Sequence, residues 1–372
     1  MNEVFETLSG ILEELRSESG ERKYSIQTEE AQSANKELKK KNKSYEKFLL
    51  DISADDRAFL EDYMETLEHA HYQEEQRAYY QEMVDAIQIL AGLGIVQPRE
   101  KVKELLKAED PTKDYNFGEI TLGTVKSADG KFNNYYRLIK PMNFDASRKY
   151  PVIVYVYGGP HSQMVKNTWQ AEMRRWEMYM AQHGYVVFVM DNRGTSNQGA
   201  EFEKAIHGQC GQAEMADQME GIKLLKSLPY VDADRIGVHG WSYGGFMTIS
   251  LLTNHPDVFK VAVAGGPVID WKWYEVMYGE RYMDSPHTNP EGYAKVSLIH
   301  KARDLKGKLL ICQGAIDNTV VWEHSLSFIR ECIKNNIQVD YFPYPCAEHN
   351  VMGKDRIHLM QKVTDYFEDY LK

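Results

Sequence analysis

The second part of this 372-residue chain predicts the α/β class, a mostly parallel β-sheet with helices on both faces. Short apolar runs typical of strands alternate there with longer segments of helical periodicity, the arrangement of successive βαβ units. One apolar run leads straight into a glycine-flanked turn at residues 240–244. The stretch 118–372 is also long enough to form one large domain with its own core.

The apolar patterns locate the individual elements. Two strands are expected to form an antiparallel lead into the sheet, at 119–125 and 133–141, and parallel strands are expected to follow from 150–159 and 185–194 onward. Helical periodicity marks five further segments, at 167–184, 213–228, 246–255, 322–336 and 355–371.

The sequence G-W-S-Y-G at 240–244 is the pattern of a nucleophile elbow, in which Ser242 occupies a tight turn between a strand and a helix. A serine hydroxyl is a weak nucleophile, so such a turn needs a base and an acid as partners. Asp317 and His349 each follow a strand-like run, and the order Ser, Asp, His is that of the α/β-hydrolases. The sequence therefore predicts an α/β-hydrolase fold with these three residues as a catalytic triad.

Other residues compete for two of these roles. Asp304 and Asp340 are the alternative acids, but they lie less well at the ends of strands. His324 and His358 are the alternative bases, but both fall within helical patterns. Asp317 and His349 are therefore preferred.

From about Tyr115 to Lys372 the chain resembles the catalytic domain of the prolyl oligopeptidase family, most closely its dipeptidyl peptidase IV branch. The resemblance rests on five segments, VYVYGGP (154–160), DNRGTSNQG (191–199), GWSYGGF (240–246), WYEVMYGERYM (273–283) and AEHNV (347–351). Their order and spacing cover the whole predicted hydrolase domain.

The resemblance implies roles for further residues. The hydroxyl of Tyr157 and the backbone N–H of Tyr243 would form the oxyanion hole. A hydrophobic pocket for proline or alanine would consist of Tyr243, Val268, Trp271, Tyr274, Tyr278 and Val320. The aromatic residues of 271–282, taken by themselves, fit a pocket wall or an ordinary aromatic core. The family usually has an asparagine two residues past the acid, where this chain has Thr319.

The first 97 residues have a different character. They contain no proline, tryptophan or cysteine, and they carry 11 Lys and Arg against 21 Asp and Glu, so most of the net charge of −11 belongs to them. Apolar residues recur at helical spacing, which predicts an all-α hairpin or small bundle. Residues 98–117 would be a linker and 118–372 the catalytic domain. A β-propeller needs several blades of about forty residues each. Only the residues before Tyr115 lie outside the region of resemblance, so a β-propeller is not expected.

The triad pattern predicts a serine hydrolase, and the resemblance implies a serine peptidase that hydrolyses short peptides after proline or alanine through an acyl-enzyme. One alternative is an esterase or promiscuous acyl hydrolase with the same triad. Another is a poorly active remnant of a peptidase whose segment 1–97 binds a protein partner or a second copy of the chain. The sequence contains no C-x-x-C or H-E-x-x-H pattern, so no metal or other cofactor is expected.

The expected location is the cytoplasm, because the chain as written lacks both the apolar core of a signal peptide and a membrane-spanning run. A full-length relative could still be exported. No interaction with membranes is expected. The basic run at 36–43 lies in a strongly acidic segment, so nucleic-acid binding is not expected either.

Overall fold

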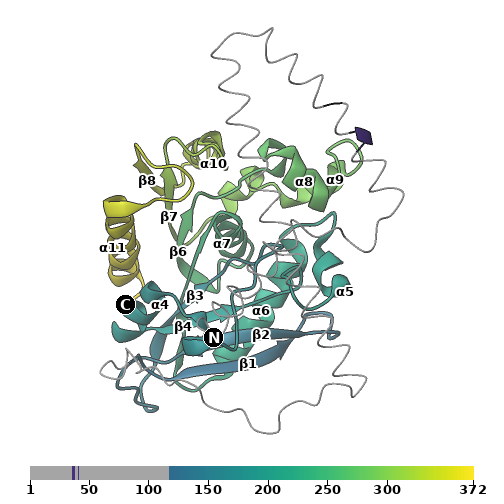
Figure 1. The fold of residues 1–372 in the computed structure, drawn as a ribbon. Helices are drawn as coiled ribbons and strands as arrows, with labels where there is room; N and C mark the ends of the chain where they lie inside the picture. The colour runs from purple at the N-terminus through teal and green to yellow at the C-terminus, as the bar shows by residue number, and fades with distance from the viewer. Residues whose placement is uncertain (1–35, 38–40, 42–116) are drawn as a thin grey trace, which may run out of the picture. The chain divides into compact units, whose positions relative to one another are not determined.

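A computed structural model describes residues 36–37, 41 and 117–372 (Figure 1). The chain divides into two units, Met1–Ala108 and Glu109–Lys372, and the account below concerns the second. The helical segment predicted for 1–97 and the linker predicted for 98–117 lie almost wholly outside the described residues, and both stay predictions.

The described unit is built on one eight-stranded sheet with the order β1-β2-β4-β3-β5-β6-β7-β8. The pairs β1/β2 and β2/β4 are antiparallel, and every other neighbouring pair is parallel, as the sequence predicted. The strands are β1 (Ile120–Lys126), β2 (Asn133–Ile139), β3 (Tyr150–Tyr155), β4 (Val186–Met190), β5 (Val231–Trp241), β6 (Phe259–Gly265), β7 (Lys308–Gly314) and β8 (Asp340–Tyr344).

Helices cover both faces of this sheet (Figure 1). Apolar side chains of α4 and α11 pack on one face, and those of α6, α7 and α10 pack on the other. The helices are α4 (Arg175–Gln182), α5 (Ala200–Glu203), α6 (Gln212–Ser227), α7 (Tyr243–Asn254), α8 (Val276–Met283), α9 (Pro290–Val296), α10 (Glu323–Lys334) and α11 (Gly353–Tyr370).

The central strands are apolar along their whole length because they are buried on both sides. All residues of β3 and β4 are buried. Their side chains alternate between the two faces, so Val152 and Val154 join the core beneath α6 and α7, whereas Ile153 joins the core beneath α4 and α11. The carboxyl ends of the parallel strands meet at one edge of the sheet, where an open α/β sheet usually carries its site.

One predicted helix is shorter than expected. Helical periodicity predicted a helix over 167–184, but α4 begins at Arg175, after a separate short turn at Trp169–Glu172. Ala171 has a positive φ of 52° in this turn. The buried guanidinium of Arg137 donates a hydrogen bond of 2.7 Å to the carbonyl of Ala171. That carbonyl is therefore held by β2 and is not free to continue a helix.

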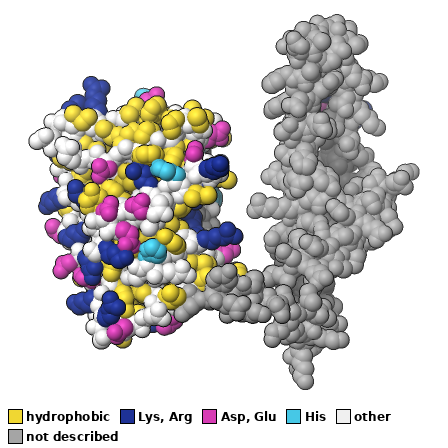
Figure 2. Space-filling model, turned by 90° about the vertical axis from the view of Figure 1, so that its left-hand side faces the viewer, with side chains coloured by type: hydrophobic (Ala, Val, Ile, Leu, Met, Phe, Trp, Pro, Cys, Tyr) yellow, Lys and Arg dark blue, Asp and Glu magenta, His cyan; other side chains and the backbone are white. Residues whose placement is uncertain are grey.

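The surface of the described unit is mixed in character. On the face seen in Figure 2, Lys and Arg side chains are interspersed with Asp and Glu, and hydrophobic side chains gather toward the upper end. Of the helices that the structure describes, none combines the length and the apolar character that a membrane span requires.

Candidate active site

Ser242 lies on the sharp turn between β5 and α7, with a positive φ of 63° and a ψ of −119°. Its backbone N–H donates to the carbonyl of Gly265 at the end of β6, at 2.7 Å. The turn lies close to the residue that follows β3, because a Cβ placed on Gly240 or on Gly244 would lie 2.3 Å from the carbonyl oxygen of Val156. The two glycines are therefore required by space, and they allow the strained serine backbone to sit at the sheet edge.

Asp317 and His349 lie together in the loops that follow β7 and β8. One carboxylate oxygen of Asp317, Oδ2, is 2.7 Å from Nδ1 of His349. The other, Oδ1, accepts the backbone N–H groups of Thr319 at 2.9 Å and Val320 at 2.8 Å. The side chain of Asp317 is buried, so its orientation is fixed from both ends.

The loop of His349 is also attached to the elbow. The indole Nε1 of Trp241, the residue before Ser242, donates a hydrogen bond of 2.9 Å to the carbonyl of His349. Ser242 and His349 line the same cavity, which has a volume of about 1330 Å³. The structure thus brings the predicted serine and histidine into one cavity, with the predicted aspartate behind the histidine.

Tyr157 follows β3 and lines this cavity beside Ser242. The pKa of the Tyr157 phenol is raised, mainly by burial, so the hydroxyl keeps its proton at neutral pH. Tyr243 is the first residue of α7, and the first N–H groups of a helix have no partner within the helix. The phenol of Tyr157 and the backbone N–H of Tyr243 are therefore two donors near Ser242.

The six residues predicted to form a hydrophobic pocket all belong to the core on the α6 and α7 side of the sheet or pack against it. Four of them form an aromatic group, in which the ring of Trp271 lies 5.2 Å from Tyr243, 5.4 Å from Tyr274 and 6.0 Å from Tyr278, between centroids. Tyr274 also lines the cavity. The other five predicted pocket residues are not among the residues that line the cavity, and all of them but Tyr278 are buried: Tyr243, Val268, Trp271, Tyr278 and Val320.

A buried carboxyl group behind the elbow was not predicted from the sequence. Glu214 of α6 accepts a hydrogen bond of 2.6 Å from the hydroxyl of Tyr243. Burial, the largest cause, raises the pKa of Glu214 to about 7. The one sequence signal for this group was the position of Glu214 on the inner face of the helix predicted at 213–228. A carboxyl group buried there needs a specific hydrogen-bond partner.

The competing residues have structural roles. His324 is buried in α10, where its Nδ1 accepts the backbone N–H of Ile269 at 2.9 Å. His358 lies in α11, and its Nδ1 is 3.0 Å from the hydroxyl of Tyr344. Asp304 ends a short 3-10 helix, and Asp340 accepts a hydrogen bond of 2.8 Å from the hydroxyl of Tyr366. Within the described residues, no group of three His, Cys, Asp or Glu side chains is arranged to hold a metal ion.

The fold and the geometry of this site together define an α/β-hydrolase. The model of the prolyl oligopeptidase family matches residues 171–372. Among curated proteins, dipeptidyl peptidase 8 of Mus musculus is 36% identical over 262 residues, which cover 68% of this chain and 29% of that protein. The chain thus spans less than a third of the length of this relative.

Two solved structures give the same result. A candidate dipeptidyl aminopeptidase IV from Bacteroides ovatus is 55% identical with a TM-score of 0.71, covering 72% of this chain and 38% of that one. Dipeptidyl peptidase 4 from Porphyromonas gingivalis is 34% identical with a TM-score of 0.64, covering 69% of this chain and 36% of that one. The chain described here belongs to the prolyl oligopeptidase family.

Proposed function

We propose that this chain is a serine peptidase that cleaves short peptides after proline or alanine, with Ser242 as nucleophile. The observation that carries the proposal is the 2.7 Å contact between Asp317 and His349, behind a cavity that His349 and the strained Ser242 line together. A base held by a buried acid next to a serine on a strand-to-helix turn is the arrangement that acyl transfer requires.

In this mechanism, Nε2 of His349 accepts the proton of the Ser242 hydroxyl while the oxygen attacks the scissile carbonyl. Asp317 keeps Nδ1 of His349 protonated and stabilises the imidazolium that forms. The phenol of Tyr157 and the N–H of Tyr243 donate to the oxyanion. His349 then gives its proton to the leaving amine, and water hydrolyses the acyl-enzyme by the same steps in reverse.

The preference for proline or alanine is supported by the aromatic group of Tyr243, Trp271, Tyr274 and Tyr278. Flat aromatic walls suit a small ring or a methyl group and leave little room for long side chains. The relatives are named as dipeptidyl peptidases, so we further propose that the released product is a dipeptide.

The test is the release of p-nitroaniline from Gly-Pro-p-nitroanilide by the 372-residue chain beside its Ser242→Ala variant. Turnover that disappears in the variant supports the proposal. A fluorophosphonate probe and a short acyl ester are tested in parallel. Labelling of Ser242 and cleavage of the ester without cleavage of the anilide would replace the peptidase by an esterase. Absence of labelling would contradict a nucleophilic Ser242.

A further inference from the structure

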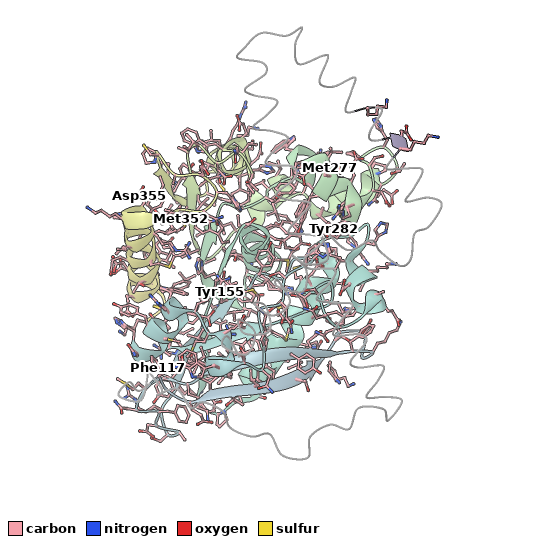
Figure 3. All side chains as sticks on the ribbon, viewed as in Figure 1. Phe117, Tyr155, Met277, Tyr282, Met352 and Asp355 are labelled. Carbon is pink, nitrogen blue, oxygen red and sulfur yellow. The ribbon has the colours of Figure 1, made fainter. Side chains whose placement is uncertain are left out.

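The cavity that Ser242 and His349 line extends well beyond Ser242, toward helices α4 and α11. Its volume of about 1330 Å³ exceeds the roughly 300–1,000 Å³ of pockets that hold a drug-sized ligand. The far part is lined by the N-terminal ends of α4 and α11 together with Tyr155, Trp176 and His239. Figure 3 marks Met352 and Asp355 at the start of α11, and Tyr155, the last residue of β3.

Three arginines gather in this far part, Arg174, Arg175 and Arg356, here called the arginine cluster. All three side chains are exposed to the cavity or to solvent. The guanidinium of Arg174 lies 4.4 Å from the ring centroid of Tyr155 and donates a hydrogen bond to its hydroxyl. This contact fixes one member of the cluster against the wall of the cavity.

Within residues 117–372, no carboxylate forms an ion pair with the arginine cluster. The single acidic residue that lines the cavity is Glu172, and its carboxylate already pairs with Lys166 at 2.9 Å. His239, which also lines the cavity, adds no negative charge. Burial, the largest cause, and the positive charges of Arg174 and Arg356 lower the pKa of His239 to about 4, so this histidine is neutral at pH 7. Glu177 also interacts electrostatically with Arg174, but its carboxylate already pairs with Arg137 at 2.6 Å. The lining of the cavity therefore carries a net positive charge.

The positions of these arginines are unfavourable for the helices that carry them. Arg174 and Arg175 are the N-cap and first residue of α4, and Arg356 is the fourth residue of α11. The N-terminus of a helix carries a partial positive charge, which favours acidic residues there and disfavours cations. Departures from such local rules are expected at functional sites.

The direction of the arginine cluster relative to Ser242 follows from the sheet. The aromatic group proposed to hold the residue before the scissile bond lies on the α6 and α7 side. Trp176 and Trp241, which line the far part of the cavity, pack into the core on the α4 and α11 side. Ser242 lies at the end of the central strand β5, between the two sides. A peptide bound with its scissile carbonyl at Ser242, before acylation, therefore extends its leaving part toward the arginine cluster.

We infer that the arginine cluster is a binding site for a carboxylate on the leaving part of the substrate, within the first few residues after the scissile bond. The inference rests on the proposed function and adds a substrate class to it. The carboxylate comes from the free C-terminus of a short peptide or from an acidic side chain. Arginine suits either, because its planar guanidinium donates two parallel hydrogen bonds to a carboxylate.

The experiment compares matched tetrapeptides with the 372-residue chain. Gly-Pro-Ala-Ala is supplied with a C-terminal carboxylate or a C-terminal amide, and the amides of Gly-Pro-Glu-Ala and Gly-Pro-Gln-Ala form a second pair. We expect kcat/KM for the charged member of at least one pair to exceed that of the neutral member by about 10-fold at low salt, as two or three partly exposed charge pairs would give. The pair that responds identifies the source of the carboxylate.

Two variants and a control distinguish binding at the arginine cluster from a general effect of the protein's positive charges. In Arg356→Gln and in Arg174→Gln, the ratio of kcat/KM between charged and neutral peptides is expected to fall several-fold. In Lys362→Gln the ratio is expected to stay, because Lys362 lies on α11 outside the cavity, over the ring of Phe342. In the wild type, 1 M NaCl is expected to bring the ratio close to one, because charges are screened within about 3 Å at that ionic strength.

Equal kcat/KM for the charged and neutral members of both pairs in the wild type, with Gly-Pro-p-nitroanilide still cleaved, would overturn the inference and leave the proposed function intact. A ratio that neither arginine variant lowers would overturn it as well. Failure to cleave both the anilide and all four peptides would contradict the proposed function itself, and the inference with it.

Discussion

At the scale of single residues, the two oxygens of Asp317 have separate tasks. Oδ1 is held by the N–H groups of Thr319 and Val320, and Oδ2 faces Nδ1 of His349. The loop that follows β7 therefore fixes the carboxylate before any substrate binds. Preorganised groups of this kind lower a reaction barrier because they need no rearrangement during the reaction.

Asp317→Asn is expected to lower kcat by about 10³- to 10⁴-fold with little change in KM, because an amide cannot hold the required tautomer of His349 or stabilise the imidazolium. Steady-state kinetics with Gly-Pro-p-nitroanilide provides the measurement. Asp304→Asn, which changes the competing acid, serves as the matched control and should retain activity. A small effect of Asp317→Asn would remove Asp317 from the proposed triad.

Tyr157→Phe is expected to lower kcat by about 10²-fold and to leave KM nearly unchanged, because it removes one donor to the oxyanion and keeps the ring that packs beside Tyr243. Tyr135→Phe is the control, since Tyr135 is 48% exposed on β2. A rise in KM with kcat unchanged would instead indicate that Tyr157 contributes to ground-state binding.

At the scale of elements, the elbow depends on the close approach of β3, β5 and α7. Gly240 is the second-to-last residue of β5, Gly244 is the second residue of α7, and both lie against the same carbonyl of Val156. The backbone strain at Ser242 is therefore maintained by the packing of three elements and not by the turn alone.

Gly244→Ala is expected to destabilise the protein by about 2–4 kcal/mol, because the new methyl group would lie 2.3 Å from the carbonyl oxygen of Val156. Urea unfolding followed by circular dichroism measures this change. Gly279→Ala in α8 is the control, since its Cβ would meet its nearest neighbour at 3.6 Å, and it should be neutral or slightly stabilising. Equal stability of the two variants would contradict the proposed packing of the elbow.

At the scale of the whole described unit, the sheet order collects loops that are far apart in sequence at one edge. Tyr157, Ser242 and His349 follow β3, β5 and β8, and they line one cavity. The same sheet separates the aromatic group from the arginine cluster. Two carboxyl groups are buried near the site, Glu214 on α6 and Asp191 after β4. Burial raises the pKa of both, so the stability of the folded protein depends on pH through them.

The free energy of unfolding is expected to depend on pH through Glu214. Its pKa of about 7 in the folded protein lies above the usual value of 4.5, so the folded state holds a proton that the unfolded chain releases between these values. This contribution to stability is complete below about pH 4.5 and is lost as the pH rises to about 7.

Glu214→Gln removes this titration and retains an acceptor for the hydroxyl of Tyr243. The free energy of unfolding of the variant, relative to wild type, should therefore increase by about 1–3 kcal/mol between pH 5 and pH 7.5. Urea unfolding at several pH values provides the data, with Glu220→Gln on the same helix as control. Asp191 is present in all three proteins, so its own titration cancels. A difference that does not vary with pH would show that Glu214 is ionised in the folded protein throughout this range.

Local sequence signals were sufficient for several features. The α/β class, the antiparallel lead and the elbow follow from apolar periodicity and from glycines at fixed positions, both of which act over a few residues. Asp317 and His349 were placed by the order of strand ends, and the structure brings them to 2.7 Å. Their roles in catalysis stay predictions, as do the peptide substrate and the partner of residues 1–97.

Only the tertiary structure decided the start of α4, the role of Glu214 and the existence of the arginine cluster. Each of these features depends on residues far apart along the chain. Arg137 binds the carbonyl of Ala171, Glu214 binds Tyr243, and Arg356 reaches the cavity beside Arg174 only in the folded protein. The sequence by itself determined the class of the fold and located the strand-to-helix turn of Ser242, because short-range patterns encode both. The shape and charge of the cavity depend on which distant side chains meet across the sheet, and no local pattern contains that information.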